Sequence, residues 1–252
     1  HEGWFTGVEK RGVVKVADEY GKTELPYALT LFKKQLLGDY SASLILLKTL
    51  NPVAEDVVGD LYYEMHEEKW EVYVVTEIDK DAWPSGTGII KAGLHPDKIV
   101  EYQQNHAEKW REVLLKDFKQ AIAEYENVRR QIDESTTEIS TELSAQELSL
   151  REKAAEFVGD CSVKVGDIVS FPVFQLHSLQ HGIKVIEFQT PHYERLIVMF
   201  AQKVLTQKHW DTADALSKMH PGVYHQPELE RLFQSAGILV ERFVDFPQFT
   251  AD

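Results

Sequence analysis

A short stretch of the sequence carries three side chains that could bind one metal ion together. Glu64 and His66 lie two residues apart in a predicted β-strand, so their side chains point to the same face. Glu71 lies near the start of the next predicted strand, on the face that would meet them. Carboxylate oxygens and imidazole nitrogens are common ligands of divalent ions. The stretch from 59 to 75 therefore predicts part of a metal site.

The elements around this stretch are mostly short strands, interrupted once by helices. Between about 96 and 157 apolar residues recur every three or four positions, as in amphipathic helices, and Ser144–Glu147 matches a capping box. The pattern lacks the βαβ alternation of a doubly wound fold and favours an antiparallel β-barrel or jelly roll. We predict strands at 41–50, Leu61–His66, Trp70–Ile78, Ile89–Ala92, Val163–Val165, Ile168–Phe171, Gly182–Gln189, Leu196–Ala201 and Ile238–Val244.

Composition and charge exclude several classes of protein. A formal net charge of −14 argues against a nucleic-acid partner, because phosphate binding needs concentrated Lys and Arg. The single cysteine, Cys161, excludes an internal disulfide and a multi-cysteine zinc site. Because no apolar run reaches the roughly 18 residues of a membrane helix and no signal peptide is present, we expect no membrane partner and a cytoplasmic location.

We expect one domain over residues 1–252, with a helical insertion at 95–158 and a C-terminal extension at 203–252. The chain begins at His1 rather than Met and ends in a strand-like segment. The gene product is therefore expected to continue beyond this sequence.

A second stretch, VGDIVSFPVFQLH at 165–177, completes a resemblance to the cupin superfamily. The spacing of Gly166, Pro172 and His177 resembles the second cupin motif, and His66-x4-Glu71 resembles the end of the first. The helical block lies between the two motifs. The resemblance implies a mainly β, cupin-type barrel with a helical insertion between the motifs. It also implies four metal ligands, namely Glu64, His66, Glu71 and His177.

The resemblance is closest to the class I phosphomannose isomerases, and it covers about residues 44–200. The segment 163–190 looks like their second motif, and Lys69-Trp70-Glu71 resembles their Lys-x-Glu. It implies a metal-dependent aldose–ketose isomerase acting on a small sugar or sugar phosphate, of the mannose-6-phosphate or lyxose isomerase type. The implied cofactor is a divalent ion, zinc first, with manganese, iron and nickel as alternatives. Cupins often pair through strands, so a homodimer is also an expectation.

Three further residues are candidates for catalysis. Lys69 would hold an anionic intermediate or a phosphate, unless it is a solvated turn lysine, and Glu187 and Arg195 would line the cavity. Arg195 follows a loop about two residues shorter than the family's. Glu64 stands where the family has a metal-binding Gln, and Phe174 where Gly is usual. Two carboxylates favour a harder metal. They also keep an alternative open, a metal-binding cupin with dioxygenase activity or a sugar-binding module without catalysis.

Overall fold

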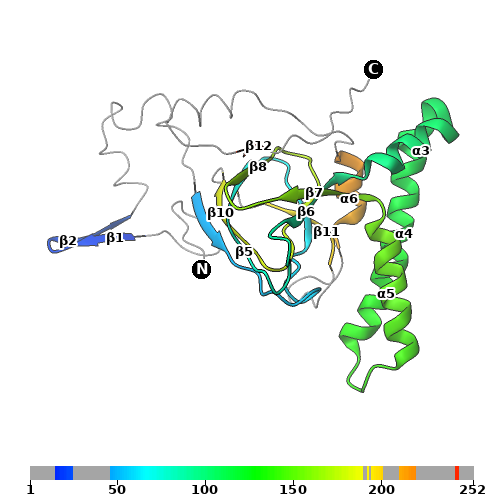
Figure 1. Ribbon diagram of the computed structural model, residues 1–252, viewed down its shortest axis with the longest axis horizontal. Coiled ribbons are helices and arrows are strands. Elements are labelled where there is room, and N and C mark those ends of the chain that lie inside the picture. Colours follow the sequence, from blue (N-terminus) through cyan, green and yellow to red (C-terminus); the bar gives the residue numbers. More distant parts are fainter. Residues whose placement is uncertain are drawn as a thin grey trace.

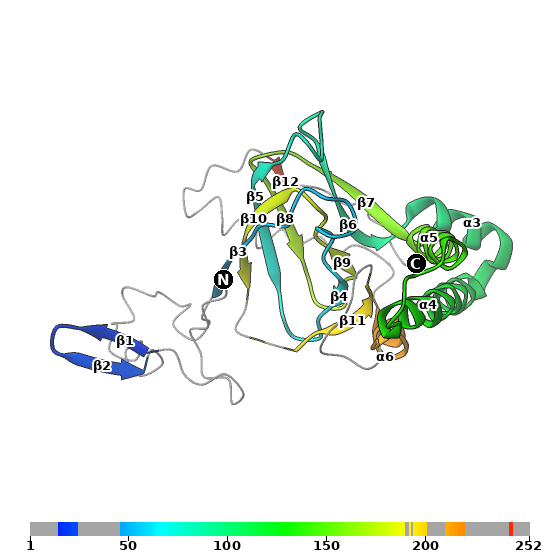
Figure 2. The same cartoon turned by 90° about the horizontal axis from the view of Figure 1, so that it is seen from below.

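Two β-sheets face each other, and helices cover the outer side of one of them (Figures 1 and 2). This computed structural model describes residues 15–24, 46–189, 192, 194–200, 210–219 and 242–243. The mainly β fold with a helical segment is therefore confirmed. The first sheet has the order β12 (Arg242–Phe243), β8 (Asp167–Phe171), β5 (Glu71–Ile78), β10 (Ile183–Gln189) and β3 (Leu46–Leu50). The second has the order β11 (Leu196–Met199), β4 (Tyr63–Met65), β9 (His177–Ser178), β6 (Gly88–Leu94) and β7 (Val158–Val163).

Strand pairing in these sheets is antiparallel except between β12 and β8. A separate hairpin joins β1 (Lys15–Asp18) to β2 (Gly21–Glu24). The predicted strand at Ile238–Val244 is described only at β12, and most of the predicted C-terminal extension lies outside the described residues.

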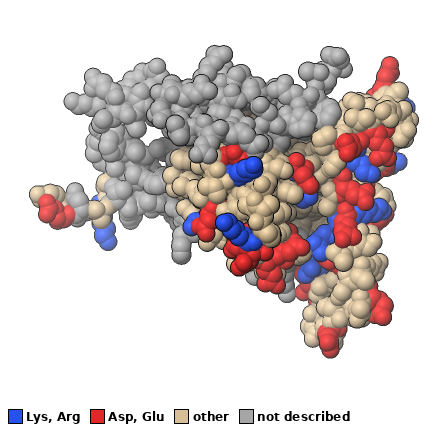
Figure 3. All heavy atoms as spheres, viewed as in Figure 1, with Lys and Arg blue, Asp and Glu red and all other residues tan. Residues whose placement is uncertain are grey.

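The helical segment runs between β6 and β7 in the chain. It contains α3 (Pro96–His106), a 3-10 turn (Ala107–Lys109), α4 (Trp110–Glu134) and α5 (Thr141–Ala155), and α6 (Thr212–Lys218) packs beside it. Ion pairs four residues apart, such as Arg129–Asp133 and Arg130–Glu126, hold α4, and charges of both signs mix along the helical segment (Figure 3). No described helix combines the length and hydropathy needed to cross a bilayer.

The two boundaries of the helical segment's last part differ most from the sequence prediction. The second helix begins at Thr141 because the hydroxyl of Ser140 accepts a hydrogen bond from the Leu143 N–H (3.1 Å), so Ser140 is the cap and not Ser144. The strand predicted at Val163–Val165 begins earlier, so that Gly159 lies inside β7, where a β-carbon would approach the Ala92 carbonyl to 2.7 Å. The strand at this position therefore starts at Val158 and ends at Val163.

The sheets and helices bury two groups of apolar side chains. The interior cluster lies between the sheets and includes Tyr73, Val75, Ile90, Val169 and Val185. The helical cluster lies between the second sheet and the helices, and it includes Tyr63, Met65, Phe118, Ile122, Leu176 and Ile197. The second sheet is thus packed on both faces.

Candidate metal centre

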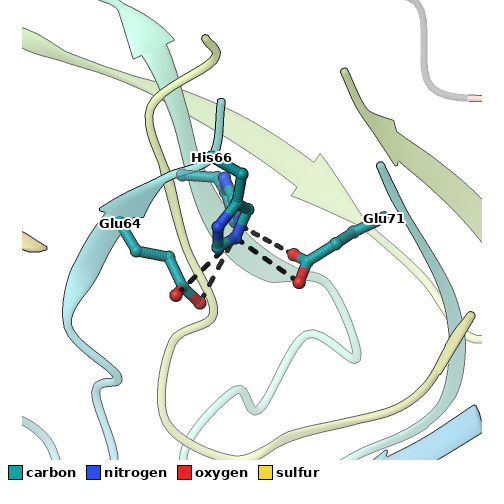
Figure 4. A group of neighbouring side chains, drawn as sticks. Glu64, His66 and Glu71 are labelled. Carbon is teal, nitrogen blue, oxygen red and sulfur yellow. Dashed lines mark hydrogen bonds and ion pairs between the residues drawn. The ribbon is translucent and has the colours of Figure 1, made fainter. Parts of the chain in front are cut away.

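Three strands bring the four predicted ligands together between the sheets. Glu64 lies in β4, directly opposite His177 in β9, and His66 follows β4 immediately. Glu71 is the first residue of β5 in the facing sheet. Each of the four offers a ligand atom, and these atoms all lie within 4.8 Å of one another. Figure 4 shows Glu64 and Glu71 pointing toward His66 from opposite sides. We call these four residues the metal cluster.

Several ligand atoms of the metal cluster lack the hydrogen bonds that buried polar atoms normally make. His66 Nε2 lies 3.6 Å from Glu64 Oε2 and 3.5 Å from Glu71 Oε1. Both His66 Nε2 and Glu64 Oε2 are buried without a hydrogen-bond partner. Such atoms are costly to bury unless something else binds them. Two imidazoles and two carboxylates therefore fit a divalent ion, which would satisfy the converging lone pairs.

Two backbone carbonyls orient the imidazole rings. His66 Nδ1 lies 3.1 Å from the Glu194 carbonyl oxygen, and His177 Nδ1 lies 3.1 Å from that of Gln175. When each Nδ1–H donates to its carbonyl, each Nε2 faces the metal cluster. Metal-binding histidines are commonly held in this way. Sequence reasoning missed both carbonyls, and no signal could have found them because every residue type has one.

Charges inside the metal cluster perturb one another. Burial opposes the charge of Glu71, but Lys69, His66 and a hydrogen bond with His177 (2.9 Å) hold the pKa of this carboxyl well below its usual range. Burial would lower the pKa of His177, but the same hydrogen bond and the charge of Glu64 raise it. Lys69 is buried beside Glu71 and not solvated. Lys69 therefore lies against the metal cluster, and the alternative of a solvated turn lysine does not hold.

Glu187 lies in the same interior, on the strand next to β5, where it faces Tyr73. It is 2% exposed and pairs with Lys48 on β3 through a 2.9 Å hydrogen bond. Burial and the negative charge of Glu71 raise the pKa of Glu187 to about 8, against the opposing effect of Lys48 and Lys69. Sequence reasoning missed Lys48, although a single lysine in the apolar run 44–50 is a signal that it has a buried partner.

Arg195 and His181 lie in other surroundings. The Arg195 guanidinium lies 5.0 Å from the ring centroid of Tyr62, which packs against the helical cluster. His181 lies in the turn before β10, where its Nδ1 bonds Asp60 (2.7 Å) and its ring stacks on Trp83. Asp56, Asp60 and His181 form a second group of possible metal ligands. Asp56 is exposed, however, and Asp60 and His181 already bond to each other.

Comparison with known proteins finds a similar fold in solved structures of phosphomannose isomerases. No protein-family model matches the sequence, and no curated protein matches it by sequence. Among solved structures, the mannose 6-phosphate isomerase of Bacillus subtilis is similar at a TM-score of 0.51 and 13% identity, over 88% of this chain and 60% of that one. This chain therefore spans less than two thirds of that enzyme.

Two other structures agree with this comparison. A histidine-to-alanine mutant of phosphomannose isomerase from Salmonella typhimurium matches at a TM-score of 0.52 and 11% identity, covering 88% of this chain and 67% of that one. A zinc-bound mannose 6-phosphate isomerase matches at 0.50 and 11% identity, with the same coverage. At these identities the likeness concerns the fold alone. The chain therefore has a phosphomannose isomerase-like cupin fold.

Proposed function

We propose that this protein is a metal-dependent aldose–ketose isomerase that acts on a sugar or sugar phosphate. The observation that carries the proposal is the metal cluster, whose buried ligand atoms converge and include several without a hydrogen-bond partner. The fold supports it, because the similar structures are mannose 6-phosphate isomerases. Zinc is the first candidate because one similar structure is zinc-bound, and manganese, iron and nickel also accept two nitrogen and two oxygen ligands.

Isomerisation moves a proton between two adjacent carbons and passes through an enediolate. A divalent ion held by Glu64, His66, Glu71 and His177 would supply Lewis-acid stabilisation of the substrate oxygens. The Glu187 carboxyl would carry the proton, because it is buried in the same interior and Lys48 holds it in place. The Lys69 ammonium would add positive charge beside Glu71 and so favour an anionic intermediate.

The test is turnover by the metal-loaded protein. Purified protein incubated with zinc or manganese should convert at least one of mannose, lyxose and mannose 6-phosphate into its ketose, and a chelator should stop the reaction. Glu187→Gln should lower the rate at least about 100-fold, the usual size of a general acid–base contribution. Glu77→Gln is the matched control, since Glu77 lies on β5 but is exposed and pairs only loosely with Lys184 (3.4 Å). No turnover across a broad sugar panel would contradict the proposal.

A second candidate is a metal-binding cupin of another activity, a dioxygenase or a sugar-binding module without catalysis. The observation that favours it is Glu64, which gives the metal cluster two carboxylates. Oxygen uptake by the iron-loaded protein, without isomerisation of any sugar, would favour the dioxygenase. Saturable sugar binding without either reaction would favour the sugar-binding module.

A further inference from the structure

The loop from Pro172 to Leu176 contacts two residues of the metal cluster through its backbone. The Phe174 N–H donates a 2.7 Å hydrogen bond to the carbonyl of His66. The next carbonyl, that of Gln175, lies 3.1 Å from Nδ1 of His177. One loop thus fixes the backbone of one histidine and the ring of the other. Any shift of the loop would move the two imidazoles relative to each other.

Phe174 has a backbone conformation that its side chain does not favour. Its φ is 62°, in the left-handed region that glycine adopts readily and bulky residues rarely do. A strained residue of this kind persists only where its surroundings determine it. At Phe174 these surroundings are the helical cluster, against which its side chain packs.

Leu176 anchors the other end of the same loop. Its side chain is fully buried in the helical cluster, and its carbonyl accepts a 2.7 Å hydrogen bond from Gly93 on β6. Gln175 therefore lies between two apolar anchors that face away from the metal cluster. These anchors restrict the directions in which the Gln175 carbonyl can point.

We propose that Phe174 is a positioning residue for the metal cluster. Its ring, held in the helical cluster, fixes the loop that orients His66 and His177. This inference rests on the proposed metal site. It means that the helical segment influences metal binding without supplying a ligand. The backbone strain at φ 62° is the cost of a side chain at this position, and the gain is a rigid ligand geometry.

Replacing Phe174 by glycine separates this role from backbone strain. Glycine relieves the left-handed φ but removes the anchor. If strain alone mattered, Phe174→Gly would leave Co²⁺ binding unchanged or tighten it. If the ring positions the loop, Phe174→Gly should weaken Co²⁺ binding about 10- to 100-fold, the range seen when partners of metal ligands are removed. Phe174→Tyr keeps the ring and should retain most of the affinity.

The experiment is a titration of the metal-free protein with Co²⁺, followed by its visible absorption, which reports coordination geometry as well as affinity. Phe174→Leu and Phe157→Leu form a matched pair, because Phe157 belongs to the same helical cluster but lies outside the loop. Both variants should lower the melting temperature. Only Phe174→Leu should weaken binding and change the absorption bands.

The outcomes separate this inference from the proposed function. Equal Co²⁺ affinity and equal spectra for wild type, Phe174→Leu and Phe174→Gly would overturn the positioning role while leaving the metal site intact. Parallel losses in Phe174→Leu and Phe157→Leu would also overturn it, because they would show a general effect of core stability. A wild-type protein that binds no Co²⁺ would refute the metal site itself.

Discussion

The two faces of β4 meet very different surroundings. Tyr63 and Met65 point into the helical cluster, which is built from apolar side chains. Glu64, between them, joins His66 on the other face among the charged groups of the interior. A strand of three residues thus separates an apolar core from a polar site. The comparison indicates that packing on the helical side holds the sheet in place, so that the opposite face can carry groups that are costly to bury.

We expect the largest effect on stability from a substitution in the helical cluster. Phe118 is fully buried on α4, and Phe118→Ala should lower the free energy of unfolding by about 3–5 kcal/mol through lost burial and a residual cavity. Urea denaturation of the metal-free protein would measure it. Because Phe118 lies outside the loop that contacts the histidines, metal affinity should stay within about twofold. A large loss of affinity would show that the helical cluster acts on the metal cluster by more than the loop at 172–176.

A substitution in the metal cluster should instead weaken metal binding strongly and change stability less. His177→Ala removes a ring whose Nε2 faces Glu71, and should weaken zinc binding by more than about 100-fold, or roughly 2.7 kcal/mol. The stability of the metal-free protein should change less than in Phe118→Ala. Competition with a chromophoric chelator would measure the affinity. Unchanged zinc binding in His177→Ala would remove His177 from the ligand set.

The smallest effect is a pH dependence that sharpens the comparison. The pKa of Glu187 is raised to about 8 and that of His177 is also raised, so between about pH 5 and 8 the folded protein binds more protons than the unfolded one. The free energy of unfolding of the metal-free protein should therefore fall as pH rises through this window, by at least about 1 kcal/mol. The low pKa of Glu71 acts at the acid end, where stabilisation is lost below about pH 4.5.

Urea denaturation in the presence of a chelator would follow this slope. Glu187→Gln removes one of the two titrating groups and should flatten the slope, whereas Phe118→Ala should lower stability equally at every pH. A stability that rises from pH 5 to 8 would contradict the assignment of these groups to the buried interior.

The sequence predicted what depends on local spacing. Alternation along β4 placed Glu64 and His66 on one face, and the period of α4 placed Phe118 and Ile122 on its buried side. The predicted starts of β7 and α5 were wrong, because Gly159-Asp160 can end a helix or lie inside a strand and because Ser140 and Ser144 can each cap a helix. A local hydrogen bond, the Ser140 cap, decides the start of α5, and a tertiary contact, the approach of Gly159 to β6, decides the start of β7.

The partners of the site residues were less accessible to sequence reasoning. Lys48 and Glu187 are 139 positions apart, and only the register of β3 with β10 brings them together. The carbonyls of Glu194 and Gln175 carry no residue-specific signal. Phe174 could be noticed because Gly is usual there, but its anchoring in the helical cluster required the fold.

The helical segment also separates the two halves of the site along the chain. Glu71 and His177 meet although they are 106 positions apart, and about half of that interval is α3, α4 and α5. Helices form from local contacts, whereas closing so long a loop is slow and costly in entropy. We therefore expect the helices to form early during folding and the four ligands to converge late. A metal ion would then bind a chain whose sheets have already docked, and its uptake would report that folding is complete.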